Sequence, residues 1–254
     1  MTPVPVEIAT PAFVLRTRPY GESDRIVTLL TEHHGKVTGI AKGARNSRRR
    51  FAGTLEPFVH IRAVFQQRSS SDLVFLLRCE LLDALQGFRR DLGRFTAGSY
   101  VLDLTDRMVL GPESGSGVYR LVAETLGLLD HGAPAEPLLR AFEMRLLGLA
   151  GWGPALDRCR TCETDVGPAE TMYLGADRAG LLCRSCVPPE TPVRPVGAAV
   201  LRELARLASG PLERATVETA GARLAEAAAV AEQLLEAVTT GPVRSRAFLG
   251  LVAR

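Results

Sequence analysis

The chain has 254 residues, of which 46% are hydrophobic and 23% charged, and its formal net charge at pH 7 is +3. This composition is typical of a globular protein and excludes disordered and collagen-like chains. No uncharged stretch approaches the roughly 20 residues of a membrane-spanning helix, and no secretory signal opens the chain, so we expect a cytoplasmic protein that does not act at membranes.

Residues 1–80 have the pattern of a small β domain. Five short stretches rich in β-branched and aromatic residues follow one another, with turn residues such as Gly21 and Gly35 between them. No helix-length pattern separates them. The five stretches are 8–18, 25–31, 37–41, 55–66 and 73–77. This arrangement predicts a small barrel or sandwich.

The positive charge is concentrated in this β domain. Residues 1–80 hold 12 Lys and Arg against 7 Asp and Glu, and no acidic residue occurs between Glu32 and Glu56. Cations without an internal acid repel one another, and an anionic partner relieves that repulsion. A solvated surface loop would show the same pattern, so both interpretations stay open. The six cations in this interval are Lys36, Lys42, Arg45, Arg48, Arg49 and Arg50.

From residue 81 the hydrophobic period changes to three or four residues, as expected for amphipathic helices. Helices are predicted over seven segments, so the second part of the chain is expected to be all-α. The predicted segments are 81–92, 95–110, 117–129, 136–149, 200–207, 222–238 and 244–252.

Residues 157–188 interrupt the helical pattern and contain four of the five cysteines. Cys159 and Cys162 form one CxxC pair, and Cys183 and Cys186 form a second pair after a gap of 20 residues. This spacing is typical of a zinc ribbon, in which a hairpin between the pairs brings all four thiolates to one ion. Four thiolates leave no open coordination position, so we expect one structural Zn²⁺. A pair of disulfides, a redox-active pair and an iron–sulfur cluster are the alternatives.

The sequence contains no evident catalytic arrangement. Asp103 and Asp106 lie one helical turn apart, but acids at this spacing are usually solvated on a helix face. The four histidines lack metal-ligand spacing, and no nucleophile-elbow or zinc-protease motif is present. Cys79 stands alone in a leucine-rich stretch, which is typical of a buried core thiol. We therefore expect a protein that is not an enzyme.

Several motifs in combination resemble the RecO family of bacterial recombination mediators. They lie in the first 60 residues and around the first cysteine pair, and the order of barrel, helices, cysteine pairs and helices agrees over the whole chain. The matching motifs are Ala12–Leu15, Tyr20–Asp24, Thr31 with Gly35–Lys36, Ala41–Arg45, Leu55–Phe58, Phe142–Gly151, Pro154, Cys159 and Cys162.

The resemblance implies an α+β multidomain fold and a non-enzymatic role in DNA repair. An N-terminal all-β OB-fold barrel would occupy 1–80, and an all-α helical domain would occupy 81–156 and 189–254, with a four-cysteine zinc finger inserted at 157–188. Such a protein would bind single- and double-stranded DNA and anneal complementary strands. With RecR it would help RecA replace single-strand-binding protein at gaps, in the cytoplasm and in association with the nucleoid.

The physical chemistry of an OB barrel agrees with binding to DNA. Such barrels hold nucleic-acid strands through a charged groove and aromatic platforms. The six cations between Glu32 and Glu56 are therefore the expected DNA-binding residues. Phe51 and Tyr20 are candidate stacking platforms, and each is equally consistent with a core position.

Two other functions share these sequence features. An OB-fold or zinc-ribbon protein that binds RNA or acts in transcription would have the same fold and metal, and annealing of DNA strands would distinguish it. A scaffold protein could instead use the basic loop to bind an acidic partner, such as the acidic C-terminal tail of single-strand-binding protein. This third role is compatible with DNA binding.

Overall fold

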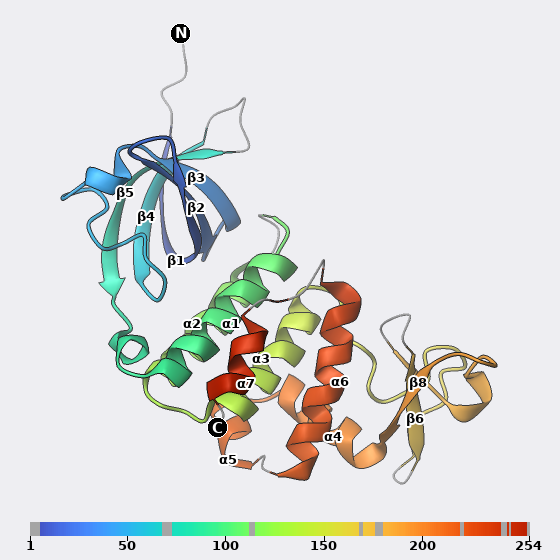
Figure 1. Ribbon diagram of the computed structural model, residues 1–254. Coiled ribbons are helices and arrows are strands. Elements are labelled where there is room, and N and C mark those ends of the chain that lie inside the picture. The colour runs from blue at the N-terminus through green and yellow to red at the C-terminus, as the bar shows by residue number, and fades with distance from the viewer. Residues whose placement is uncertain are drawn as a thin grey trace. The chain divides into compact units, whose positions relative to one another are not determined.

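The chain forms two compact units (Figure 1). Unit 1 comprises residues 1–131 together with 245–254, and unit 2 comprises residues 132–244. None of the helices that the structure describes is long and apolar enough to cross a membrane. The computed structural model describes residues 6–67, 73–111, 115–167, 170–175, 180–218, 221–239, 243 and 245–252.

Unit 1 begins with a closed five-stranded barrel, coloured blue to cyan in Figure 1. The strands follow one another around the barrel in the order β1-β2-β3-β5-β4, with β3 and β5 parallel and the other pairs antiparallel. A small closed barrel of this kind is typical of an OB fold, so the predicted N-terminal fold is confirmed. The strands are β1 (Glu7–Tyr20), β2 (Asp24–Thr31), β3 (Gly35–Ala41), β4 (His60–Gln66) and β5 (Val74–Asp83).

Strand β1 is long because its two neighbours pair with different halves of it. It pairs with β4 from Glu7 to Phe13, and with β2 as far as Tyr20. The register with β2 shifts between Val14 and Arg16, and such a bulge increases the local twist that carries the strand around a barrel. Beyond Phe13, the edge of β1 that faced β4 has no strand partner in the described part of the chain.

The inward faces of the strands form an apolar core. Leu29, Ile61 and Phe65 are each at most 1% exposed. Where β3 meets β5, only glycine allows the close approach of the two strands, because a Cβ atom on Gly39 would lie 2.8 Å from Val74 Cγ2. The close contact between β3 and β5 therefore depends on a residue without a side chain.

Three helices complete unit 1: α1 (Leu92–Met108), α2 (Gly115–Asp130) and α7 (Arg246–Val252). The carboxylate of Asp91 caps α1 by accepting the N–H of Arg94 at 2.8 Å. Near the other end of α1, Asp103 Oδ2 accepts the Ser245 hydroxyl at 2.8 Å, which fixes the start of the C-terminal helix α7 against α1.

Two polar clusters join the barrel to its helices. Asp106 of α1 is 8% exposed and forms ion pairs with Arg16 of β1 and Lys36 of β3. Tyr119 of α2 lies with its hydroxyl 2.6 Å from Nε2 of His60 on β4. The sequence suggested that Asp103 and Asp106 are solvated on a helix face. Both are instead structural, because each accepts a hydrogen bond from a side chain distant in sequence.

Unit 2 is built around helix α3 (Ala135–Leu149), which packs against three later helices. Leu139, Phe142 and Leu146 form the buried face that the sequence predicts, whereas Leu149 is 49% exposed. The three helices are α4 (Ala198–Ala208), α5 (Leu212–Glu218) and α6 (Ala222–Val238).

A three-stranded antiparallel sheet in the order β7-β6-β8 carries the cysteine region of unit 2. Its strands are β6 (Thr171–Gly175), β7 (Leu181–Leu182) and β8 (Val193–Gly197). Strand β8 runs directly into α4, so the sheet extends past residue 188, where the sequence places the end of the zinc finger. The four-part division of the chain predicted from the sequence differs from the two units, and it stays a prediction.

The helix predicted over 81–92 is wrong. Strand β5 continues to Asp83, a 3₁₀ turn follows at Gln86–Arg89, and α1 begins only at Leu92. Leu81 is 53% exposed and pairs with β4, so the apolar residues that imitate a helical period here do not share a buried face. The structure also shows α5 and β8, which the sequence pattern did not reveal.

Candidate metal centre and nucleic-acid interface

The four cysteines predicted to bind a metal converge in unit 2. Their Sγ atoms all lie within 4.8 Å of one another, and none is in a disulfide. The Sγ atoms of Cys162 and Cys183 are 3.7 Å apart, close to the edge of about 3.8 Å of a thiolate tetrahedron with metal–sulfur distances of about 2.3 Å. Cys159 and Cys186 complete the set. The arrangement is therefore a four-cysteine metal-binding cluster.

Backbone hydrogen bonds within each CxxC pair turn its two thiols to the same side. The N–H of Glu163 donates to the carbonyl of Cys159 at 2.9 Å, and Glu163 has a φ of +58°, as a tight turn requires. In the second pair, the N–H of Cys186 donates to the carbonyl of Cys183 at 3.0 Å. These contacts are local, which is why the CxxC spacing was enough to predict that the two thiols of a pair face the same ion.

The sheet of unit 2 brings the two pairs together. Cys159 forms a parallel bridge with Leu181 of β7, and Cys183 follows that strand directly. The N–H of Cys183 also points to Sγ of Cys159 at 3.4 Å. The hairpin β6–β7 therefore acts as the predicted ribbon that places the second pair beside the first.

The electrostatic surroundings of the cluster favour the thiolates of Cys159 and Cys162. Burial raises the pKa of Cys159, but N–H groups such as those of Cys162 and Cys183 outweigh this effect and lower it to about 6. A hydrogen bond from Thr164 lowers the pKa of Cys162. The pKa of Cys186 is raised to about 12 by the neighbouring cysteines, of which Cys183 has the largest effect. A divalent cation at the centre would stabilise all four as thiolates.

Cys79 belongs to the barrel core and not to this cluster. It is 6% exposed and lies among the barrel's buried apolar residues. Burial raises the pKa of its thiol to about 12. The interpretation of Cys79 as a buried core thiol is confirmed.

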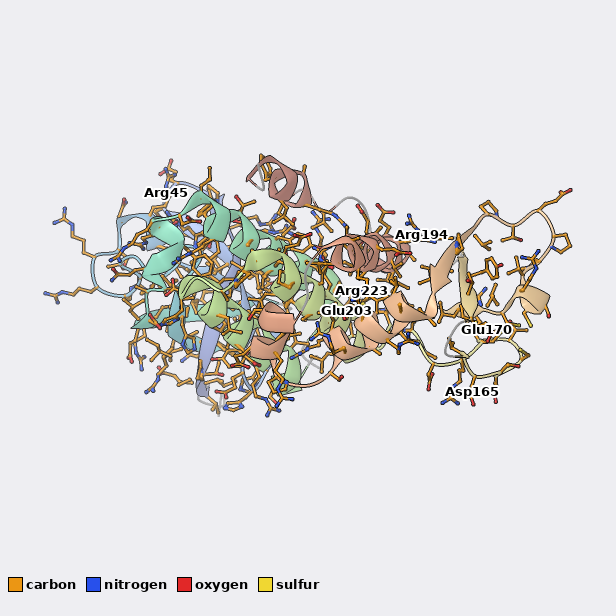
Figure 2. All side chains as sticks on the ribbon, turned by 90° about the horizontal axis from the view of Figure 1, so that it is seen from below. Arg45, Asp165, Glu170, Arg194, Glu203 and Arg223 are labelled. Carbon is orange, nitrogen blue, oxygen red and sulfur yellow. The ribbon has the colours of Figure 1, made fainter. Side chains whose placement is uncertain are left out.

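The second candidate site is the basic loop, defined here as residues 42–50, which follows β3. Arg48 and Arg49 are exposed, and neither has an ion pair or hydrogen bond to another side chain in the part of the chain that the structure describes. Figure 2 shows long nitrogen-tipped side chains extending away from this part of the barrel, with Arg45 labelled beside it. The loop thus presents cationic groups to solvent.

The β1–β2 hairpin holds the start of the basic loop. Asp24 Oδ1 accepts the N–H of Gly43 at 2.8 Å, and the carbonyl of Ser23 accepts the N–H of Arg45 at 3.0 Å. The guanidinium of Arg45 also donates to the carbonyl of Glu22 at 3.0 Å. Sequence reasoning did not predict this anchoring, although a short acidic residue at a glycine-containing turn was a signal for it.

Strand β5 and the barrel core hold the end of the loop. The carbonyl of Arg50 accepts the N–H of Cys79 at 2.9 Å, and its guanidinium donates to the carbonyl of Lys42 at 2.8 Å. Phe51 beside it is 3% exposed, so this residue is an anchor in the core. Of the two candidate stacking platforms, only Tyr20 is accessible, at 53% exposed.

Lys36 differs from the other five predicted DNA-binding residues. It lies in β3, where its ammonium is 3.0 Å from Asp106 Oδ1 and also donates to the carbonyl of Asp106. Its side chain is 19% exposed. Lys42, by contrast, is exposed in the loop, with its ammonium 5.6 Å from the centre of the Phe75 ring. The charge of Lys36 is therefore matched within the protein.

Two protein-family models match the chain: Recombination protein O N terminal over residues 4–85 and Recombination protein O C terminal over residues 89–247. Curated proteins named DNA repair protein RecO are similar. The protein of Anaeromyxobacter sp. (strain K) is 40% identical over 205 residues, 81% of this chain and 80% of its own. The one from Anaeromyxobacter sp. (strain Fw109-5) is 43% identical over 196 residues, 76% of each chain. The one from Geobacter metallireducens is 34% identical over 240 residues, 94% of this chain and 96% of its own.

Proposed function

Because this chain belongs to the RecO family of DNA repair proteins, we propose that it is a DNA-binding recombination mediator that acts without catalysing a reaction. Its basic loop binds the phosphates of single- and double-stranded DNA. Family membership supports the role in repair, and the exposed cations of the barrel support the mode of binding.

The observation that carries the proposal is the exposure of Arg48 and Arg49 on a loop fixed at both ends. Neither guanidinium has an ion pair or hydrogen bond to another side chain among the described residues, so an approaching phosphate does not have to displace an internal partner. The anchors at Gly43 and Arg50 limit the conformational entropy that the loop loses when it binds. Lys42, Arg45 and Arg50 add charge beside them, and Lys36 has a structural role.

Strand annealing follows from contacts of this kind. Cations that bind phosphates leave the base edges free, and they also reduce the repulsion between two strands that approach each other. A protein that holds a single strand by its backbone can therefore present its bases to a complementary strand. This property favours the family role over sequence-specific RNA or promoter binding.

The proposal includes the partners that the family resemblance implies. With RecR, the protein would help RecA replace single-strand-binding protein at gaps, in the cytoplasm and at the nucleoid. The acidic tail of single-strand-binding protein would also find complementary charge on the basic loop. Family membership alone supports these partners.

We assign one structural Zn²⁺ to the four-cysteine cluster. A set of four thiolates at tetrahedral separations is the donor set typical of structural zinc, and it leaves no position for a substrate. Cys159, Cys162, Cys183 and Cys186 would hold the ion, which would fix the ribbon of unit 2.

Fluorescence anisotropy with a labelled single-stranded oligonucleotide at several salt concentrations tests the proposal. If five cations meet phosphates, log K falls with log salt with a slope of about −3.5. In Arg48→Ala/Arg49→Ala the slope is expected to shrink to about −2, because two phosphate contacts are lost. The same variant should anneal complementary strands more slowly.

The matched control is Arg89→Ala/Arg90→Ala, which removes another adjacent pair of exposed arginines from unit 1. This variant is expected to keep the slope of the unmodified protein. If both double variants changed the slope equally, binding would not be localised to the basic loop. If the unmodified protein bound no DNA, the scaffold function would replace the proposal.

A further inference from the structure

A groove opens on the barrel beside the second half of β1. Its volume is about 390 Å³, and residues from β1, from β2, from the basic loop and from the segment before β4 line it. Three arginines and one glutamate face it together with apolar groups. The lining residues are Val14, Leu15, Arg16, Thr17, Pro19, Arg25, Arg45, Glu56 and Pro57.

The groove exists because β1 extends beyond its pairing with β4, which stops at Phe13 and His60. The segment before β4 covers part of the free edge of β1: the Thr17 hydroxyl donates to the carbonyl of Leu55 at 2.8 Å. The next residue, Glu56, accepts a hydrogen bond from Arg25 of β2 at 2.9 Å. These two contacts fix the far wall, and the space between the wall and the strand remains open.

The groove is continuous with the basic loop. Arg45, labelled in Figure 2, belongs to the loop and also lines the groove, where its guanidinium is held by the carbonyl of Glu22. A strand whose phosphates lie on the loop therefore passes the mouth of the groove. Pro19 and Pro57 offer apolar ring faces there, and Val14, at 2% exposed, is a buried lining residue.

We propose that this groove receives one unstacked base of the bound DNA strand, with guanine as the best fit. The inference rests on the proposed function, because the strand is brought there by the basic loop. A volume of about 390 Å³ is near the lower limit of the range of about 300–1,000 Å³ for ligand pockets, which suits one nucleotide and excludes a duplex.

Hydrogen-bonding chemistry selects guanine. Its Watson–Crick edge carries two neighbouring N–H donors beside one carbonyl oxygen, whereas the edge of thymine has a single donor between two carbonyls. A carboxylate accepts from the donors and a guanidinium donates to the carbonyl. Arg25 and Glu56 supply these two groups side by side. Oε1 of Glu56 binds Arg25, and its second oxygen is available, since the side chain is 55% exposed.

The test compares two strands that differ in one donor. Each is a thymine strand with an isolated guanine at every third position, and in one strand inosine, which lacks the exocyclic amino group, replaces guanine. The intact chain is expected to bind the guanine strand about fivefold more tightly, the effect of one net hydrogen bond. In Glu56→Ala the preference should disappear, because no acceptor for the guanine amino group remains at that position. The slope against salt should be kept, because the phosphate contacts are unchanged.

The control is Glu80→Ala, which removes another exposed carboxylate of the barrel that pairs with an arginine, Arg78, and does not line the groove. It should keep the fivefold preference. Equal binding of the two strands by the unmodified chain, with a steep salt dependence, would overturn the base pocket and leave the proposed function intact. Absence of strand binding would overturn both. A preference that survived in Glu56→Ala would place base recognition elsewhere and would also overturn the assignment.

Discussion

The metal cluster of unit 2 and the basic loop of unit 1 are both irregular segments, yet they are built in opposite ways. In the cluster, four side chains converge within 4.8 Å and the backbone follows them. In the basic loop, the backbone is fixed at Gly43 and Arg50, and the cations diverge into solvent. A site for a small ion must be closed, whereas a site for a polyanion must keep its charges apart and accessible.

A second contrast is between two cations of the same segment, Lys36 and Arg48, which differ in whether the protein neutralises their charge. Lys36 and Arg48 both carry one positive charge in a segment without acids, but Asp106 of α1 matches the charge of Lys36 and leaves that of Arg48 available. Charge in a sequence therefore indicates a binding surface only where the fold supplies no internal partner. The predictions below separate structural from functional residues on this basis.

The largest expected effect is the loss of the metal in Cys159→Ser. Structural zinc contributes about 10–16 kcal/mol of binding free energy in small zinc domains, so removal of a buried ligand should leave the ribbon unfolded. We expect metal content to fall from one ion per chain to none and the ribbon to become sensitive to protease. DNA binding by the basic loop should be unchanged.

Cys79→Ala is the matched control, since it removes the one cysteine outside the cluster and should retain one metal ion per chain. Loss of DNA binding in Cys159→Ser, with unit 1 still folded, would contradict the separation of the two sites. Metal analysis and limited proteolysis, followed by anisotropy on the same samples, give the three measurements.

Lys36→Met should lower the free energy of unfolding of unit 1 by about 2 kcal/mol, because Asp106 loses a charged partner in a buried position. The dependence of DNA affinity on salt should stay the same. Arg48→Met is the matched variant and should show the reverse: little change in stability and a smaller salt slope. Urea unfolding and anisotropy measure the two effects. A smaller salt slope in Lys36→Met would show that this lysine also meets phosphate.

One pH effect on stability is expected in unit 1, at His60. Burial lowers the pKa of His60 below its usual 6.5, against the opposing effects of Asp83 and Glu32. The unfolded chain therefore takes up the proton at higher pH than the folded one, so the free energy of unfolding is greatest above about pH 6.5 and falls as the pH drops below it.

His60→Gln should remove this dependence, because the amide keeps a polar group near the Tyr119 hydroxyl and does not titrate. Urea unfolding at about pH 7 and at about pH 5.5 measures the difference. If the variant lost stability on acidification as steeply as the unmodified protein, another group would be responsible.

The smallest expected effect concerns the anchor of the basic loop. Asp24→Ala removes the acceptor of the Gly43 N–H, whereas Asp24→Asn keeps an acceptor at that position and removes the same charge. Single-stranded DNA should bind about threefold more weakly to the alanine variant than to the asparagine variant, as expected from one hydrogen bond. Their salt slopes should agree. Equal affinities would show that the anchor does not affect binding.

Features with a local cause were predictable from the sequence. The CxxC spacing identified the four cysteines that converge, because each turn involves only a few neighbouring residues, and strand-like stretches separated by turns indicated the barrel. Local patterns failed where tertiary contacts decided. The apolar residues at 81–92 imitate a helical period, but pairing with β4 extends β5 through Leu81 and Leu82.

By itself, the sequence determined the order of barrel, helices and cysteine ribbon, the members of the four-cysteine cluster and the segment that carries the positive charge. The tertiary structure alone decided which of those charges are available. Lys36 and Asp106 are 70 positions apart, and Arg16 and Asp106 are 90. No periodic pattern relates residues at such separations, because an ion pair depends on where the folded chain places two side chains and not on the sequence between them.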